Sequence, residues 1–170
     1  MTVIAPVRMD GGMKTDEQRA GLATPVGPVW VEAVDGAITR AGWGTDRDST
    51  VGPDAPLLAE TIAELRAYFD GRLTRFTVPL NPGVTGLSAR VLDAMLAIPI
   101  GETRTYGDLA RDLNAPAQAI GQACGANPIP ILIPCHRILS STGLGGYSGA
   151  GGVETKVALL KLEGAASLLI

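Results

Sequence analysis

The chemically most distinctive residues of this chain are Cys135 and His136, a cysteine directly followed by the only histidine in the sequence. A cysteine attacks an electrophile as its thiolate, and a histidine can accept the thiol proton near neutral pH. The apolar segment Ile129–Ile133 comes just before the pair and is expected to be an extended stretch that delivers it into a buried place. Free cysteines are more often packing residues than nucleophiles, so adjacency alone leaves both interpretations open.

Two polar residues are placed to support this pair. A histidine base needs an acceptor on its second nitrogen, and Glu163, near the end of the last predicted helix, is the candidate carboxylate. Asn127, before the Pro128 turn, is placed to brace the loop that carries the cysteine. The second cysteine, Cys124, lies in a small-residue helical stretch with no histidine beside it, and we interpret it as a packing residue.

The length and composition of the chain exclude several classes of protein. A chain of 170 residues forms one domain or two small ones. No run is long and apolar enough to span a bilayer, and residues 1–12 lack the order of a secretory signal, so no membrane association is expected. Two cysteines without a disulfide framework favour the reducing cytoplasm. One histidine and two cysteines cannot build a Cys/His metal site, so we expect no catalytic metal and no cofactor.

Charge is distributed unevenly. Residues 1–83 hold eight Lys/Arg and eleven Asp/Glu, whereas residues 84–170 hold six of each. This balance argues against a protein that coats nucleic acid by charge alone. Any DNA contact in the second half would depend on shape, helix N-termini and a few cations, of which Arg137 is one.

The first half of the chain is typical of a small α+β unit. Residues 1–20 are polar and aperiodic and are expected to form a disordered leader. Asp35-Gly36 is a strong hairpin turn between two strands. The predicted elements of the domain 21–83 are strand 28–34, strand 37–43, a helix that starts near Asp54 and ends at Gly71, and a short strand 75–80.

The second half, residues 84–170, is predicted to be mainly helical, with helices over 87–98, 106–113, 117–125 and 153–163. Two short helices joined by a tight turn form a helix-turn-helix pattern. The second of them carries small residues, including Ala119 and Gly121, which suit either close approach to DNA or tight packing against a neighbouring helix. The glycine-rich loop 143–152 is predicted to form a pocket wall, with a flexible linker as the alternative.

Together these residues resemble the O6-alkylguanine-DNA alkyltransferases. The most specific match is the segment Asn127–Ile138, with its Asn-Pro turn and its Pro-Cys-His-Arg sequence. The match to this family extends upstream through Gly101–Ala110. Downstream it runs through Gly146–Gly149 and Lys156 to Leu162–Gly164. The resemblance is firm over residues 84–164. It is weak in the first half, where Pro25–Pro28 and the hairpin carry it.

The resemblance implies an α+β fold with an N-terminal ribonuclease-H-like domain and a C-terminal helix-turn-helix domain that holds the active site. It implies DNA repair in which the protein binds double-stranded DNA through the minor groove and flips an alkylated guanine into a pocket. Cys135 then takes the alkyl group from the O6 atom in a reaction that each molecule performs once. O4-alkylthymine is a second candidate substrate, and we expect the protein to act as a monomer without a cofactor.

The resemblance also implies roles for individual residues. Cys135 is the alkyl acceptor, His136 activates it through a water, Glu163 orients the histidine, and Asn127 is the hinge asparagine. The residues expected to bind the substrate are Tyr106, Tyr147, Ser148 and Gly149. Those expected to contact DNA are Gln118, Ala119, Gly121 and Arg137.

One departure from the family pattern sets up an alternative function. Where the family carries an arginine that fills the gap left by the flipped base, this chain has Gln118, which brings no charge. A non-catalytic lesion-binding protein is therefore the runner-up, although such relatives lack the acceptor cysteine that is present here. A cysteine hydrolase using Cys135 and His136 is a third hypothesis, disfavoured because no oxyanion-hole motif accompanies the pair.

Overall fold

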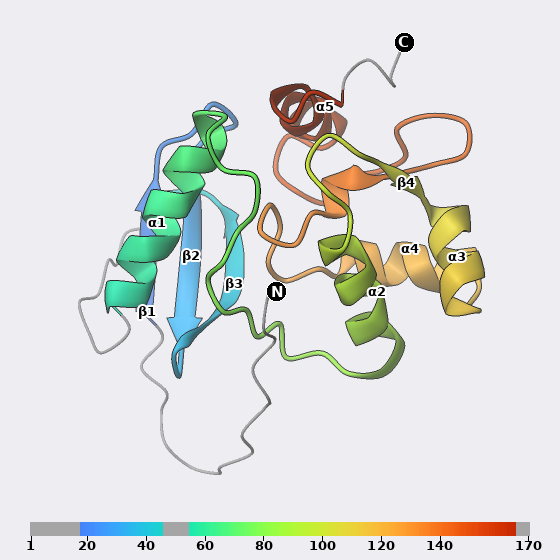
Figure 1. The fold of residues 1–170 in the computed structure, drawn as a ribbon, viewed down its shortest axis with the longest axis horizontal. Helices are drawn as coiled ribbons and strands as arrows, with labels where there is room; N and C mark the ends of the chain where they lie inside the picture. Colours follow the sequence, from blue (N-terminus) through green and yellow to red (C-terminus); the bar gives the residue numbers. More distant parts are fainter. Residues whose placement is uncertain (1–17, 46–54, 166–170) are drawn as a thin grey trace. The chain divides into compact units, whose positions relative to one another are not determined.

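The computed structural model describes residues 18–45 and 55–165, and the chain divides into two compact units, residues 1–83 and 84–170 (Figure 1). The N-terminal unit contains β1 (Gln18–Leu22), β2 (Val29–Val34), β3 (Ala37–Trp43) and α1 (Ala55–Phe69). The C-terminal unit contains α2 (Gly86–Leu96), β4 (Arg104–Thr105), α3 (Tyr106–Leu113), α4 (Ala117–Gly125), the 3-10 turn η1 (Cys135–Arg137), β5 (Ile138–Leu139) and α5 (Val153–Leu162). No described helix is long and apolar enough to cross a membrane.

The N-terminal unit is an antiparallel sheet, in the order β1-β2-β3, with α1 packed against β1 and β2. The predicted hairpin is confirmed: Asp35 and Gly36 both have positive φ, 51° and 77°, as a two-residue turn matched to strand twist requires. Val31, Ile38, Leu65 and other apolar side chains of the sheet and α1 are buried between them. The α+β class expected from the sequence is the observed one.

Three predictions for the first half differ from the structure or lie outside the described residues. The disordered leader was expected to end at residue 20, but residues 18–20 belong to β1. Residues 1–17 of the expected leader lie outside the described residues. The predicted helix start at Asp54 also lies outside them. Residues 75–80 do not form a strand. Only Leu80 bridges to Ile38, because Pro79 has no N–H to donate to a ladder.

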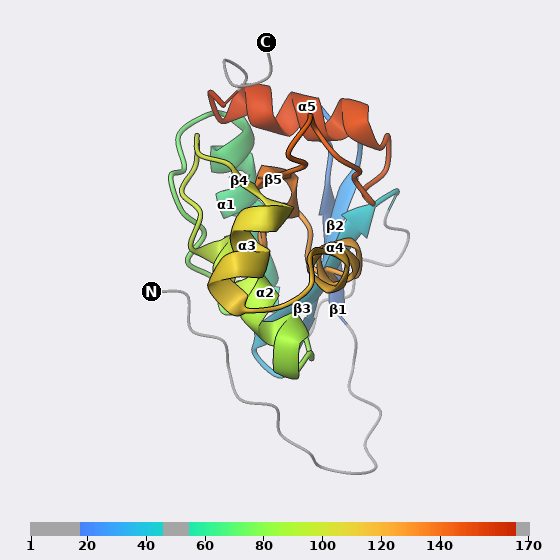
Figure 2. The ribbon, with the colours of Figure 1, turned by 90° about the vertical axis from the view of Figure 1, so that its right-hand side faces the viewer.

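In the C-terminal unit, α4 packs against α2 and α3, and β4 pairs in parallel with β5 (Figure 2). The predicted bounds of α3 and α4 are confirmed. Thr105 caps α3 by accepting a hydrogen bond from the Asp108 N–H, and the Asp108 carboxylate accepts one from the Thr105 N–H, which is a capping box. Asn114 ends the helix in the left-handed conformation with φ 50°. The helix-turn-helix geometry is therefore fixed by local residues.

The apolar segment before Cys135 is buried, as expected, but it is not extended. The Ile133 N–H donates to the Ile129 carbonyl at 2.9 Å, which folds the segment into a turn. Ile131 has φ 73°, a conformation that a β-branched residue adopts only under constraint. The segment therefore forms a compact turn beneath the cysteine.

Candidate active site

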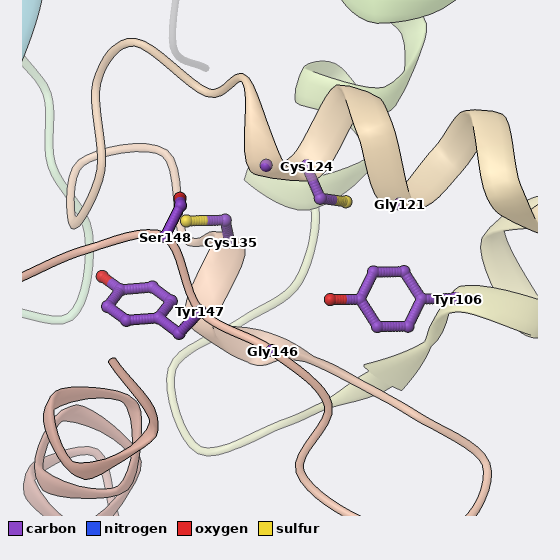
Figure 3. A pocket seen from close by; sticks show the side chains of 8 residues that line it. Tyr106, Gly121, Cys124, Cys135, Gly146, Tyr147 and Ser148 are labelled. Carbon is purple, nitrogen blue, oxygen red and sulfur yellow. The ribbon is translucent and has the colours of Figure 1, made fainter. Parts of the chain in front are cut away.

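A pocket of about 320 Å³ opens beside Cys135. It is lined by Tyr106 at the start of α3, by Gly121, Cys124 and Gly125 of α4, by Cys135 of η1, and by Gly146, Tyr147 and Ser148 of the loop after β5 (Figure 3). Segments far apart in the sequence thus converge on the cysteine. The glycine-rich loop forms part of the pocket wall, which was the sharper of its two interpretations.

Cys135 is the first residue of η1 and is 6% exposed. Burial raises the pKa of its thiol, while a hydrogen bond from Asn127 and the positive charge of Lys156 act in the opposite direction. The thiol is therefore the stable resting form, and a nearby base is needed to take its proton during a reaction.

Asn127 fixes the turn that carries the cysteine. Its side-chain nitrogen donates to the Ile133 carbonyl at 2.9 Å, and its side-chain oxygen accepts from the Ile129 N–H at 3.0 Å. The amide therefore bridges both ends of the apolar turn just before Cys135. The bracing that the sequence suggested for this asparagine has a direct geometric basis.

His136, Glu163 and Arg137 form a buried polar cluster behind the pocket. His136 Nε2 lies 2.6 Å from Glu163 Oε1, and Arg137 reaches both carboxylate oxygens at 2.9 Å through Nε and a terminal nitrogen. The other terminal nitrogen of Arg137 donates to the Ile98 carbonyl at 2.6 Å. The carboxylate is thus paired with a charged donor, and the cluster carries no net charge when His136 is neutral.

The protonation of this cluster follows from its burial and its hydrogen bonds. Burial would raise the pKa of Glu163, but hydrogen bonds from His136 and Arg137 outweigh it and lower the pKa to about 2. Burial lowers the pKa of His136, more than Glu163 raises it. Glu163 is therefore an anion that accepts a hydrogen bond, and His136 is a neutral ring with its proton on Nε2. Its Nδ1 is left as the basic nitrogen, buried and without a hydrogen-bond partner among the described residues.

Three of the four residues predicted to bind the substrate line the pocket, and their role there stays a prediction. Tyr106, Tyr147 and Ser148 line the pocket, and the Tyr106 hydroxyl points toward its middle (Figure 3). Burial raises the pKa of Tyr106, so its hydroxyl remains a hydrogen-bond donor at neutral pH. Gly149 does not line the pocket; its carbonyl instead accepts from the Gly152 N–H at 3.0 Å in the turn before α5.

Among the predicted DNA-contacting residues, Gln118 is exposed on α4, and Ala119 and Gly121 are partly exposed on the same helix. Arg137 was predicted to contact DNA, and this is wrong: it is 6% exposed, and its guanidinium is held by Glu163 and a carbonyl. A cation in a Cys-His-Arg sequence gives no sign from sequence alone that it will point inward.

Sequence reasoning missed two residues of this region. Cys124 is buried, as expected of a packing residue, but it also lines the pocket. Lys156 on α5 is fully buried and donates to three carbonyls of the segment after Cys135. The described residues contain no group of three His, Cys, Asp or Glu side chains able to hold a metal ion.

Family models match both units of the chain. Residues 19–82 match the ribonuclease-like domain, and residues 87–165 the DNA-binding domain, of 6-O-methylguanine DNA methyltransferase. The methylated-DNA–protein-cysteine methyltransferase of Mycobacterium leprae is 40% identical over 149 residues, which span 84% of this chain and 89% of the relative. The protein of the same name from Methanosarcina acetivorans is 36% identical over 149 residues, which span 83% of this chain and 94% of the relative.

Solved structures agree with the sequence comparison. The Mycobacterium tuberculosis O6-methylguanine methyltransferase superposes with a TM-score of 0.74 at 35% identity, covering 88% of this chain and 94% of that one. Mycobacterium tuberculosis OGT in complex with DNA superposes with a TM-score of 0.76 at 38% identity, with the same coverage. Both domain models match, relatives at 36–40% identity span most of the chain, and the chain therefore belongs to the 6-O-methylguanine DNA methyltransferase family.

Proposed function

We propose that this protein repairs DNA by transferring the alkyl group of O6-alkylguanine to Cys135, once per molecule. The observation that supports this most directly is the pocket that contains Cys135, backed by the buried His136–Glu163 pair. Membership of the family supplies the reaction class, because relatives that cover most of this chain carry the name methylated-DNA–protein-cysteine methyltransferase.

The reaction is a displacement at the alkyl carbon. The sulfur of Cys135 forms a bond to that carbon while the carbon–O6 bond breaks, and the electron pair of the broken bond stays with guanine. The thiol proton passes through a bridging water to Nδ1 of His136, a buried nitrogen that has no hydrogen-bond partner among the described residues. The resulting imidazolium is stabilised by the Glu163 carboxylate, 2.6 Å from its other nitrogen.

Departure of guanine is aided by hydrogen bonds to the ring as negative charge develops on it. Tyr106 is placed for this role, since its hydroxyl points into the pocket and keeps its proton at neutral pH (Figure 3). The Tyr147–Ser148 segment covers the base from the loop side. The products are a protein thioether, which is stable and ends the activity of that molecule, and an unmodified guanine once the relayed proton reaches it.

The lesion reaches the pocket as a flipped nucleotide, with α4 lying along the minor groove of the duplex. Gln118, Ala119 and Gly121 form the contact surface, and their small or uncharged side chains allow close approach. We propose that the protein does this as a monomer in the cytoplasm, where its two free cysteines stay reduced. O4-alkylthymine is a secondary candidate substrate.

The decisive experiment is intact-mass analysis after incubation with duplex DNA that contains O6-methylguanine, followed by peptide mapping. We expect a gain of one CH₂ unit, located on Cys135. Cys124→Ser is the matched control because Cys124 lines the same pocket, and it should still gain the methyl group. Cys135→Ala should gain nothing and leave the lesion intact. Binding of the lesion without any mass change in the folded, reduced protein would refute the proposal and favour the lesion-binding alternative.

A further inference from the structure

The helix-turn-helix, together with the strand that leads into it, carries no net charge, and each of its cations already has a carboxylate partner. Residues 104–125 contain two arginines, Arg104 and Arg111, and two acidic residues, Asp108 and Asp112. All four lie on β4 or α3, and α4 has no charged residue. DNA is a polyanion, and its nonspecific affinity for a protein comes from cations that neutralise phosphates. The contacts among these four side chains therefore decide how strongly this part of the unit can hold undamaged DNA.

Arg104 is held between two carboxylates. A terminal nitrogen of its guanidinium donates to Asp112 Oδ2 at 2.7 Å, and its Nε lies 3.9 Å from Asp108 Oδ2. Asp108 and Asp112 are one helical turn apart on α3, so they lie on the same face of that helix. Arg111 donates to the other carboxylate oxygen of Asp108. The four side chains thus form one continuous network, which holds its members more firmly than an isolated surface ion pair does.

The two carboxylates differ in what else they do. Asp108 also caps α3, because it accepts a hydrogen bond from the Thr105 N–H at 2.9 Å. Asp112 lies in the last turn of α3, where the helix dipole disfavours an anion, and its side chain is 58% exposed. The hydrogen bond and the ion pair that the structure gives the Asp112 carboxylate both go to Arg104. Removal of this carboxylate should therefore release Arg104 without loss of the helix.

The network lies next to the pocket into which the proposed function places the flipped nucleotide. Strand β4 runs directly into α3, and α3 packs against α4 (Figure 2). Tyr106, the first residue of α3, follows Arg104 by two positions and lines the pocket. A nucleotide that enters the pocket would bring its flanking phosphates to this end of α3. The Arg104 side chain is 43% exposed, so a phosphate would be able to reach it if the carboxylates did not hold it.

We propose that Asp112, together with Asp108, withholds Arg104 from the phosphate backbone and so keeps the affinity for undamaged duplex low. This inference rests on the proposed function. Asp112 acts in two ways that add, since it pairs with the Arg104 guanidinium and its own negative charge repels phosphates. The effect favours specificity, because a lesion complex also gains the contacts of the flipped base in the pocket. An undamaged duplex has only its backbone to bind.

The test measures binding of a short unmodified duplex to the parent and to Asp112→Ala, by fluorescence anisotropy between about 50 and 200 mM salt. Alanine is a better helix former than aspartate, so the variant should fold, and circular dichroism checks that it does. We expect Asp112→Ala to bind the duplex about threefold more tightly, or better, at the lowest salt. One newly neutralised phosphate steepens the salt slope by about 0.9, so the loss of affinity across this range should grow about 3.5-fold.

Two controls separate the release of Arg104 from a change in overall charge. Asp70→Ala removes the same charge and frees Arg72 from its 2.9 Å ion pair, but it does so in the N-terminal unit, and it should bind the duplex as the parent does. The second control is a double-mutant cycle. Arg104→Gln should cost at least about threefold more affinity in the Asp112→Ala background than in the parent, because Arg104 is free to contact phosphate only when Asp112 is gone.

Three outcomes would overturn the inference. The first is a folded Asp112→Ala variant whose duplex affinity and salt slope equal those of the parent. The second is an equal gain in Asp70→Ala, which would reflect net charge alone. The third is an equal cost of Arg104→Gln in both backgrounds, which would mean that Asp112 does not hold Arg104 back. Failure of the proposed function would look different, because the parent would then gain no methyl group from a duplex with O6-methylguanine, whereas binding of the unmodified duplex requires no transfer.

Discussion

Replacing Glu163 with glutamine is expected to destabilise the C-terminal unit by about 3 kcal/mol at neutral pH. The side chain of Glu163 is 1% exposed and accepts hydrogen bonds from both His136 and Arg137. Its pKa is lowered from 4.5 to about 2, and each pKa unit corresponds to about 1.4 kcal/mol of differential interaction. Glutamine keeps the shape of the Glu163 side chain, but it removes the negative charge that pairs with Arg137. Its amide N–H group would also face the N–H donors of His136 or Arg137, where an acceptor is needed. Breaking a buried pair in this way typically costs about 3–5 kcal/mol.

The effect has a defined pH dependence. A carboxyl whose folded pKa is depressed contributes stability that is fully present above its unfolded pKa, here 4.5, and that is lost as the pH falls through the folded value of about 2. Between these values the unfolded chain binds more protons at this site than the folded protein does. The difference in unfolding free energy between parent and Glu163→Gln should therefore be constant above about pH 5.5, be about half as large near pH 3, and largely vanish by pH 2.

The assay must report the C-terminal unit alone. Both tryptophans, Trp30 and Trp43, lie in the N-terminal unit, so their fluorescence follows the wrong part of the molecule. A Cys135→Ser background leaves Cys124, buried in α4, as the only thiol. Pulsed labelling of Cys124 across a urea series then gives the unfolding free energy of this unit, with and without Glu163→Gln.

A destabilisation below about 1 kcal/mol at pH 7 would refute the reasoning, because it would mean that the ion pair contributes no more than an exposed one. A difference that stays the same down to pH 2 would refute it as well. In that case the lost stability would come from packing and not from the charge of the carboxylate.

Three further predictions concern the reaction and DNA binding. His136→Ala should slow transfer to Cys135 by roughly 10²–10⁴-fold with little effect on duplex affinity, as measured by single-turnover kinetics and a binding titration, and equal losses in both would contradict a role as base. Gln118→Arg should strengthen duplex binding or speed repair in the same assays, whereas an unchanged variant would mean that α4 contacts DNA differently. Duplex affinity should fall less than about 20-fold between 50 and 200 mM salt, and a loss of about 10³-fold would reveal phosphate contacts that this surface does not supply.

Local sequence signals predicted the helical scaffold well. The Thr105 cap and the Asn114 stop define α3 through hydrogen bonds within a few residues, so no distant contact had to be known. The Asp35-Gly36 hairpin is equally local, because both residues tolerate positive φ. The family resemblance then placed Cys135, His136, Glu163 and Asn127, and the structure brings their segments together as expected.

Predictions failed where a distant partner decides the outcome. A lysine or arginine is normally expected at the surface, and only the arrangement of a whole loop or a buried carboxylate shows that Lys156 and Arg137 point inward. The turn at Ile131 was missed because an apolar β-branched run favours extended structure, and the Asn127 amide overrides that preference by binding both ends of the segment. The strand β1 was missed because its sequence has little alternation of its own and is held by pairing with β2.

The distribution of cations in the C-terminal unit limits how the protein can recognise DNA. Residues 84–165 contain six Lys and Arg side chains, and five of them donate hydrogen bonds to carboxylates or carbonyls of the same unit. These five are Arg90, Arg104, Arg111, Arg137 and Lys156. The sixth is Lys161. Helix α4 has no charged residue at all.

Nonspecific affinity from phosphate neutralisation should accordingly be weak. Under the proposed function, we expect discrimination of a lesion to depend on how well the flipped base fills the pocket beside Cys135. Gln118 on α4 fits this weak dependence on charge, because its side chain is uncharged. Under the proposed function, we expect this uncharged side chain to keep the protein from being held on undamaged DNA, at the cost of a slower capture of each damaged base.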